Sequence, residues 1–247
     1  MILLHGNGED HSIFAETAEI LKEHFAVYMP DTRGHGRSEG VEEYHYSDMA
    51  EDLRELIRAL GLERPLLCGF SDGGIVGLLA AVRDPGLLSA MVLCGANLTP
   101  KGMKTRWYRL FQKEYQRTGD AKLKLMLREP HITAEQLARI RIPVLVTAGS
   151  RDLIRRRETE RIAAGIPGSH LKILKGEDHG SYIVHCGKLA ELLVDFFDSR
   201  EPAGLTENKR EQRGESHAVL LLGIILNPYI CEKIVKFHQL YSDSWNV

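Results

Sequence analysis

Short apolar runs alternate along this chain with longer stretches of helical periodicity. The runs at 66–70 and 90–94 are almost continuously hydrophobic, as expected of strands buried on both faces. The stretch at 73–82, which lies between them, predicts a buried helix. Strands that alternate with helices are typical of a parallel sheet covered by helices on both faces. The predicted fold class is therefore α/β.

The same alternation extends over about the first 200 residues. Ser47 stands where an N-cap would open a helix. The pattern predicts further strands at 2–4, 26–28, 144–147 and 171–174, of which the strand at 171–174 is the last, and further helices at 13–25, 49–60, 158–166 and 183–197.

Residues 98–142 break this rhythm. Within them, Thr133 and Gln136 have the spacing of a capping box, which predicts a short helix ending near Ile140. We interpret 98–142 as a cap inserted into one α/β domain that spans residues 1–200. Residues 201–217 are polar and charged, which predicts a linker or a disordered stretch, and residues 218–247 form a tail of unknown role.

Composition excludes several classes of protein. A formal charge of -2 and a pI near 6.6 provide no basic surface for nucleic acid. The four cysteines contain no CxxC pair, so we expect neither a disulfide framework nor a metal site. The start of the chain lacks the features of a secretory signal, and the longest apolar run, 218–226, is far shorter than the roughly 20 residues of a membrane span. We expect a cytoplasmic protein without nucleic-acid or membrane partners, and its oligomeric state stays open.

The segment Gly69-Phe70-Ser71-Asp72-Gly73 fits the pattern G-x-S-x-G between a predicted strand and a predicted helix. A strand–turn–helix with glycines on both sides exposes the serine hydroxyl at a sharp turn. Such a hydroxyl is a weak nucleophile, so it needs a base to take its proton and a third group to orient that base. The alternative is that Ser71 only caps the helix.

Two residues are candidates for these supporting roles. Asp152 follows the strand at 144–147, and His179 follows the strand at 171–174. Because the carboxyl ends of parallel strands meet at one edge of a sheet, both side chains are expected to lie near Ser71. We predict that His179 is the general base and Asp152 its orienting carboxylate. Asp152 as a helix N-cap and His179 as a solvated loop residue remain the alternatives.

The loop His5-Gly6-Asn7-Gly8 follows the first predicted strand. Its backbone N–H groups can face an oxyanion that develops during acyl transfer. We predict that the N–H groups of Asn7 and Asp72 are the two oxyanion donors. An ordinary glycine turn is the alternative.

These motifs together resemble the α/β-hydrolase superfamily over roughly residues 1–200. The resemblance rests on His5 to Gly8, Asp31-Thr32-Arg33-Gly34-His35-Gly36-Arg37-Ser38, Gly69 to Gly73, Asp152 and His179. The elbow Ser71-Asp72-Gly73-Gly74 also resembles the valacyclovir-hydrolase (biphenyl-hydrolase-like) branch. The resemblance implies hydrolysis of esters, thioesters, amides, lactones or carbon–carbon bonds without a cofactor, through an acyl-enzyme on Ser71. Dehalogenases and epoxide hydrolases of this superfamily are disfavoured because they use an aspartate nucleophile.

The chain departs from this superfamily at its start. Members usually carry two strands before the His-Gly loop, whereas here Met1 lies almost on that strand. We therefore expect the first two strands of the fold to be missing, which would leave the strand at 26–28 as a sheet edge open to pairing. One hypothesis is that residues 218–226 cover this edge. A wrongly assigned start codon or a tail fused by a coding error are the alternatives.

Charge is unevenly distributed between the cap and the rest of the chain. The cap has eleven Lys or Arg against four Asp or Glu. This charge either steers anionic substrates or forms a solvated helical face, and we favour the second interpretation. Trp107, Tyr108, Leu110 and Phe111 are expected to form the apolar underside of the cap. Asp72 is a candidate contact for the ammonium group of an amino-acid ester, although it could equally interact with the helix dipole.

The sequence as a whole predicts a carboxylesterase-like serine hydrolase that acts on a small molecule. Two other functions stay open. One is a carbon–carbon bond hydrolase, which would differ chiefly in the shape of its pocket. The other is a catalytically impaired scaffold that only binds ligands.

Overall fold

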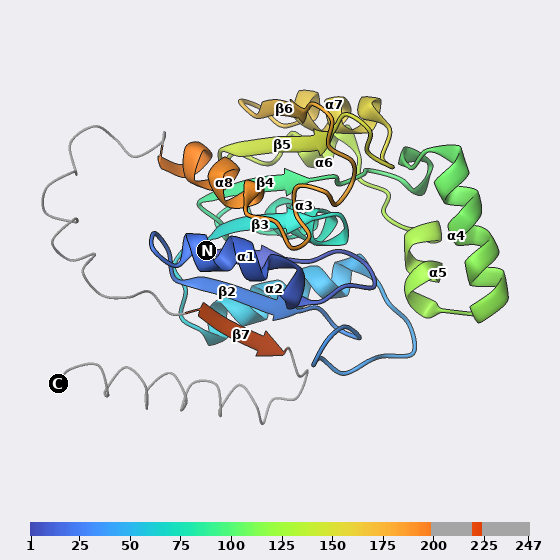
Figure 1. Cartoon of the computed structure of the whole chain (residues 1–247), viewed down its shortest axis with the longest axis horizontal. Helices are drawn as coiled ribbons and strands as arrows, with labels where there is room; N and C mark the ends of the chain where they lie inside the picture. Colours follow the sequence, from blue (N-terminus) through green and yellow to red (C-terminus); the bar gives the residue numbers. More distant parts are fainter. Residues whose placement is uncertain (199–218, 224–247) are drawn as a thin grey trace, which may run out of the picture.

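Seven parallel strands form one sheet in the described part of the chain (Figure 1). The structure is a computed structural model, and it describes residues 1–198 and 219–223. The strand order is β6-β5-β4-β3-β1-β2-β7. The strands are β1 (Ile2–Leu4), β2 (Val27–Asp31), β3 (Leu66–Phe70), β4 (Ala90–Cys94), β5 (Val144–Gly149), β6 (His170–Leu174) and β7 (Val219–Gly223).

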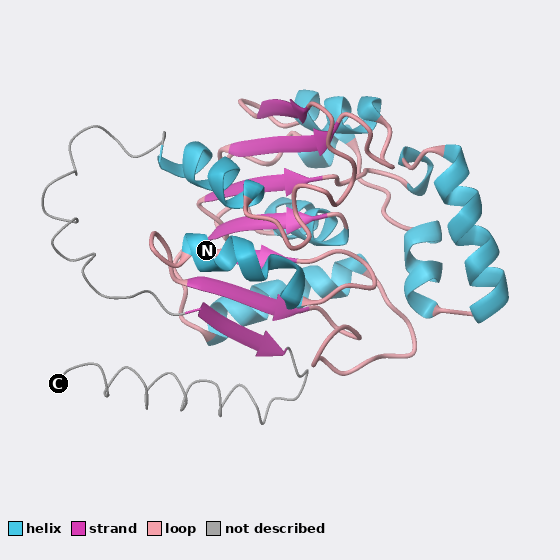
Figure 2. Cartoon of the chain, viewed as in Figure 1, coloured by secondary structure: helices cyan, strands magenta, loops and turns pink. Residues whose placement is uncertain are grey.

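Helices cover both faces of this sheet (Figure 2). One face carries α1 (Ala15–Leu21) and α8 (Lys188–Asp198), and the other carries α2 (Tyr46–Ala59), α3 (Asp72–Arg83) and α7 (Arg156–Gly165). Successive strand residues point to opposite faces. Accordingly Ile2 and Leu4 pack with α2 and α3, whereas Leu3 packs with α1 and α8. The predicted α/β class, with a parallel sheet between helices, is confirmed.

The order of the strands fixes where a site can form. The chain adds β2 on one side of β1 and then returns to add β3, β4, β5 and β6 on the other side. Ligands of open α/β sheets bind outside the carboxyl ends of the strands at such a reversal. The loops after β1, β3, β5 and β6 all open at this edge, and these loops carry the predicted site residues.

Several helices begin or end differently from the prediction; α8, for example, begins at Lys188 and not at 183. The helix expected at 13–25 is a 3-10 turn, His11–Phe14, followed by α1, which ends at Leu21. The N-cap of α2 is His45, so the prediction of Ser47 as the cap is wrong. The N–H of Tyr46, in the first turn, donates instead to the carboxylate of Glu129 at 3.1 Å. A long-range contact thus replaces the local cap.

The prediction that the strand at 171–174 is the last one is also wrong. β7 follows it in the chain and pairs in parallel with β2, from Val27 opposite Val219 to Asp31 opposite Gly223. This pairing confirms, for residues 219–223, that the C-terminal segment covers the edge of β2. The predicted linker at 201–217 and the remainder of the tail lie outside the described residues.

The segment 98–142, called the cap here, contains the 3-10 turn Pro100–Gly102 and the helices α4 (Thr105–Thr118), α5 (Ala121–Arg128) and α6 (Ala134–Leu137). The capping box of Thr133 and Gln136 is present. Figure 1 shows α4 and α5 beyond the carboxyl ends of the strands. The expectation that Leu110 belongs to an apolar underside is wrong, because its side chain on α4 is 51% exposed. None of the helices in the described residues is both long and apolar enough to cross a membrane.

Candidate active site

Ser71 occupies a strained turn between β3 and α3. Its φ of 51° and ψ of -113° are unusual for a residue with a side chain. The turn is held by hydrogen bonds from Ser71 N to the carbonyl of Cys94, 2.8 Å, and from Gly73 N to the carbonyl of His5, 3.1 Å. A Cβ at Gly73 would lie 2.3 Å from the carbonyl oxygen of Leu4. The second glycine of the motif is therefore required by the close packing of α3 against β1.

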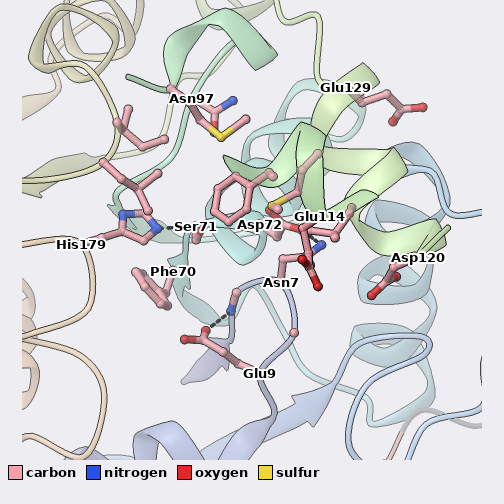
Figure 3. Close-up of a pocket in the computed structure, with 18 of the residues that line it drawn as sticks. Asn7, Glu9, Phe70, Ser71, Asp72, Asn97, Glu114, Asp120, Glu129 and His179 are labelled. Atoms are coloured by element: carbon pink, nitrogen blue, oxygen red, sulfur yellow. Dashed lines mark hydrogen bonds between the residues drawn. The ribbon is translucent and has the colours of Figure 1, made fainter. Parts of the chain in front are cut away.

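The three residues predicted to act together do meet at this edge of the sheet. Figure 3 shows two of them, Ser71 and His179, facing each other. The Oγ of Ser71 lies 3.1 Å from Nε2 of His179, and Nδ1 of His179 lies 2.7 Å from Oδ1 of Asp152. Ser71 makes no side-chain cap bond to α3, so the alternative that it only caps the helix is contradicted. A hydroxyl, an imidazole and a carboxylate from three separate loops thus form one hydrogen-bonded chain.

Asp152 is in a position to fix the tautomer of His179. Its side chain is only 2% exposed, and Oδ1 also accepts the N–H of Ile154 at 2.7 Å. A carboxylate at Nδ1 favours the tautomer with its proton on Nδ1, which leaves Nε2 free to accept the proton of Ser71. Asp152 is not the cap of α7, because Arg155 holds that position.

Other residues near these loops are occupied elsewhere. The carboxylate of Asp178 accepts the backbone N–H groups of residues 180 and 181. The amide of Asn97 donates to the carbonyl of Thr99, and the exposed His185 faces Glu16. None of the three competes with Asp152 or His179 for Ser71.

The His-Gly loop lies beside the elbow. Within the described residues, the N–H groups of Asn7 and Asp72 make no hydrogen bond, and both residues line the same cavity as Ser71. The N–H of Gly6, by contrast, donates to Oε2 of Glu9 at 3.0 Å. The two predicted oxyanion donors are therefore the ones that remain available to a ligand.

Asp72 has a side chain that is 6% exposed and held by two donors. Nδ2 of Asn7 donates to its Oδ2 at 2.9 Å, and the hydroxyl of Tyr46 also donates to this carboxylate. Burial raises the pKa of Asp72 to about 6, although both hydrogen bonds act in the opposite direction. The carboxylate thus connects the elbow to the His-Gly loop and to the first turn of α2.

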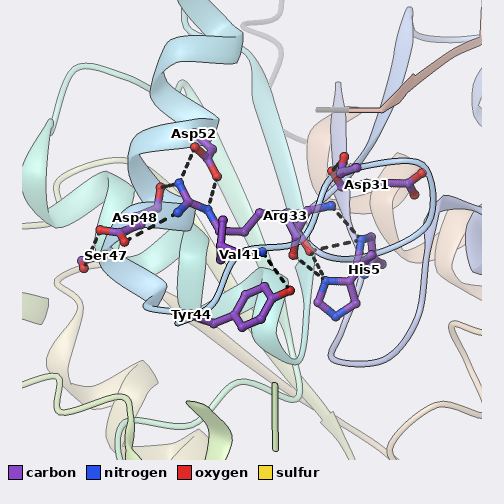
Figure 4. A network of polar contacts seen from close by, with 11 residues as sticks. His5, Asp31, Arg33, Val41, Tyr44, Ser47, Asp48 and Asp52 are labelled. Atoms are coloured by element: carbon purple, nitrogen blue, oxygen red, sulfur yellow. Dashed lines mark hydrogen bonds and ion pairs between the residues drawn. The ribbon is translucent and has the colours of Figure 1, made fainter. Parts of the chain in front are cut away.

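The segment 31–38 holds the His-Gly loop in place through a hydrogen bond. Nε2 of His35 accepts the N–H of Gly8 at 3.0 Å, while its Nδ1 lies 3.0 Å from the carbonyl of Arg33. Burial lowers the pKa of His35 to about 4, so the ring is neutral and able to accept at neutral pH. Figure 4 shows Arg33 bound in turn to Asp52, through two N–H donors at 2.7 Å. This segment is part of the resemblance described above, but the role of His35 in holding the His-Gly loop was not predicted.

One cluster in the described residues has the composition of a metal site. Ligand atoms of Asp10, His11 and Asp31 lie within 4.8 Å of one another. However, Asp10 accepts the N–H of Ser12, and the buried Asp31 accepts the backbone N–H groups of His11 and Arg37. These bonds give the cluster a structural role at the end of β2.

A cavity of about 320 Å³ opens in front of Ser71, between the sheet edge and the cap. Apolar side chains such as Phe111, Leu123 and Met126 form part of its wall. Among the described residues, five carboxylates line it and no Lys or Arg does; the five are Glu9, Asp72, Glu114, Asp120 and Glu129 (Figure 3). Three of the four acidic residues of the cap therefore face the cavity, and none of its eleven basic residues does. This arrangement supports the interpretation of the basic charge as a solvated face.

Comparison with known proteins agrees with this geometry. A model of the α/β hydrolase fold family matches residues 1–131. The chain is 26% identical to 3-oxoadipate enol-lactonase 1 of Acinetobacter baylyi, over 59% of this chain and 68% of that protein. It is also 26% identical to the human serine hydrolase BPHL, over 77% of this chain and 75% of that protein.

Solved structures show the same fold. An esterase from Exiguobacterium antarcticum superposes with a TM-score of 0.69 at 21% identity, covering 80% of this chain and 91% of the esterase. An enol-lactonase from Burkholderia xenovorans superposes with a TM-score of 0.65 at 22% identity, covering 80% and 90%. With the family match over more than half of its length, the chain belongs to the α/β-hydrolase fold family and is a hydrolase of that type.

Proposed function

We propose that this chain is a serine hydrolase that cleaves an ester-like bond of a small molecule through an acyl-enzyme on Ser71. The observation that carries this proposal is the hydrogen-bonded chain from Ser71 Oγ through His179 to Asp152, with distances of 3.1 and 2.7 Å. In this proposal the N–H groups of Asn7 and Asp72 stabilise the oxyanion.

The proposed reaction has two halves. As Oγ of Ser71 bonds to the carbonyl carbon, Nε2 of His179 takes the hydroxyl proton, and the carbonyl oxygen becomes an oxyanion that the two N–H groups stabilise. The bond from carbon to the leaving group then breaks, and His179 gives its proton to the leaving atom. Water next attacks the acyl-enzyme, with its proton passing to His179, and the acid departs as Ser71 regains its proton. No cofactor takes part in these steps.

The lining of the cavity favours an acyl group with a positive charge. Five carboxylates, with no Lys or Arg among the described lining residues, give this cavity a negative potential, which attracts cations and repels anions. Two of these carboxylates form ion pairs, Glu114 with Arg117 and Glu129 with His45. The other three, those of Glu9, Asp72 and Asp120, have no cationic partner in the described residues. We propose that the substrate carries an ammonium group, as an amino-acid ester does, with Asp72 as one candidate contact.

A panel of p-nitrophenyl esters and amino-acid esters tests the proposal. Wild type should cleave esters and react with a fluorophosphonate probe at Ser71. The Ser71→Ala protein should lose the label and at least about 10³-fold in kcat, because the nucleophile is absent. Ser47→Ala, which removes an exposed hydroxyl far from these loops in sequence, is the matched control and should behave as wild type.

Two results would contradict the proposal. Folded wild-type protein that is not labelled at Ser71 would favour a scaffold that only binds ligands. Labelled protein that cleaves carbon–carbon bonds but no ester or thioester would favour a carbon–carbon bond hydrolase.

A further inference from the structure

A second hollow meets the catalytic cavity at His179. This groove has a volume of about 450 Å³ and is lined by Arg106, Trp107, Arg151, Leu153, Asp178 and His179. Leu153 and His179 line both spaces, whereas Ser71 and Asp72 line only the cavity. The imidazole of His179 therefore lies where the two spaces join.

The two spaces differ in charge. Arg106 comes from α4 of the cap, and Arg151 comes from the loop after β5, so two segments distant in sequence each bring an arginine to the groove. Neither forms an ion pair with a carboxylate of the described residues: Arg106 lies over the ring of Trp107, 5.4 Å from its centroid, and Arg151 donates to the carbonyl of Gly176.

Asp178 supplies the one carboxylate that lines the groove in the described part of the chain. Hydrogen bonds from the backbone N–H groups of Ser181 and Gly180 hold its pKa below the ordinary value, so it is ionised at neutral pH. Two positive charges against one negative charge leave the groove positive. The cavity on the other side of His179 is lined, as far as residues 1–198 and 219–223 are concerned, by five carboxylates and no Lys or Arg.

The roles of His179 and of the oxyanion donors imply that the two spaces bind opposite ends of the substrate. A general acid must be within hydrogen-bond reach of the leaving atom when it donates its proton. In the proposed mechanism that acid is His179, so the leaving group lies on the side of the imidazole. The oxyanion donors Asn7 and Asp72 line the cavity, so the acyl group lies there.

We propose that the groove is a leaving-group subsite that binds an anionic alcohol, so that the substrate is an ester with a cationic acyl part and an anionic leaving part. This inference rests on the proposed function, because it needs His179 as the acid. Arg106 and Arg151 bind the anionic group, and Trp107 contacts the carbon skeleton that joins it to the scissile oxygen. When the carbonyl carbon–oxygen bond breaks, the oxygen takes the proton from Nε2 and the anion leaves through the groove.

Two esters with the same acyl group test this subsite. One releases 4-nitrophenol, and the other releases 5-hydroxy-2-nitrobenzoate, which adds a carboxylate to the same ring. The ratio of kcat/KM, carboxylated over plain, should fall about tenfold when both arginines are replaced, in Arg106→Gln/Arg151→Gln. The ratio should also fall in wild type when the salt concentration rises, because ions screen exposed charges.

Matched variants distinguish binding by the groove from an effect of the overall charge of the protein. Arg109→Gln removes an exposed positive charge from α4 outside the groove and should leave the ratio unchanged. Asp178→Asn removes the negative charge of the groove while keeping an acceptor, and should raise the ratio. In the Ser71→Ala protein, 5-hydroxy-2-nitrobenzoate should bind more weakly once both arginines are replaced.

The outcomes distinguish the subsite from the proposed function. If wild type cleaves the plain ester and the ratio does not change in the double variant, or both esters slow equally, the subsite is wrong and the hydrolase stands. If wild type cleaves neither ester and Ser71 is not labelled, the proposed function fails, and the subsite fails with it.

Discussion

The side chain of Asn7 donates to the carboxylate of Asp72 at 2.9 Å. These are the two residues whose backbone N–H groups are proposed to stabilise the oxyanion, and they come from different loops, one after β1 and one after β3. Nδ2 of Asn7 also lies 3.3 Å from the carbonyl of Lys122 on α5. The bond between the two side chains therefore sets the spacing of the two donors, and Asn7 links them to the cap.

Breaking this bond should slow the chemical step for every substrate. We expect Asp72→Ala, which leaves Nδ2 of Asn7 without this acceptor, to lower kcat about tenfold for all esters, because misplaced donors stabilise the oxyanion less well. Asn7→Ala should have a similar effect, and the two changes combined should cost less than their sum, since they remove the same contact. Steady-state kinetics of the four proteins measure this. Additive effects would argue against the tether, and a rise in KM confined to amino-acid esters would instead assign Asp72 to binding an ammonium group.

The buried carboxyl of Asp72 should also make stability depend on pH. Its pKa is raised to about 6 in the folded protein from 3.8, so between these values the folded state holds a proton that the unfolded state has lost. The free energy of unfolding should therefore fall as pH rises from about 4 to 6, by up to about 3 kcal/mol from this group.

Urea unfolding of wild type and Asp72→Asn at pH 4, 5, 6 and 7 isolates this contribution, because other groups cancel in the difference. Wild type should lose stability relative to the variant as pH rises. A difference that is constant with pH, or that changes in wild type's favour, would contradict the raised pKa.

Gly95, at the end of β4, leaves space for the imidazole of His179. A Cβ at this position would lie 2.8 Å from Cε1 and 2.9 Å from Nδ1 of His179. Both distances are shorter than a Cβ normally makes with a non-bonded atom. We expect Gly95→Ala to push the ring away from Ser71 and to lower kcat about 100-fold, the cost typical of a displacement of about 1 Å. Gly95 has a φ of 65°, so Gly61→Ala is the control, because Gly61 has a similar φ of 61° and no atom lies within 4 Å of its Cβ position. Full activity in a folded Gly95→Ala protein would show that His179 has room to move.

The main residues of the site could be predicted because each lies in the loop that follows a strand. Apolar runs mark the strands, and the carboxyl ends of parallel strands meet at one edge, so Ser71, Asp152 and His179 could be placed together without knowledge of side-chain contacts. The same reasoning placed Asn7 after β1. Local pattern and sheet geometry were sufficient for these residues.

Contacts between distant segments could not be predicted in this way. The cap has a positive net charge in sequence, yet Glu114, Asp120 and Glu129 are the charged residues it turns toward the cavity. Which side of α4 and α5 faces inward depends on how the cap docks, which no local pattern encodes. His45 at the start of α2 is similar, since the contact from Glu129 replaces the cap expected from Ser47.

His35 should act on catalysis without contacting the substrate. Its neutral ring accepts the N–H of Gly8 and so holds the loop that carries Asn7. We expect His35→Ala to lower kcat about tenfold with little change in KM, because Gly8 loses its acceptor and the oxyanion donor of Asn7 becomes less well ordered. His35→Gln, whose amide oxygen can reach toward the same N–H, should recover part of the loss. His24→Ala changes a histidine in the turn after α1 and serves as the control. If His35→Ala raised KM and left kcat unchanged, the ring would belong to substrate binding rather than to the support of the loop.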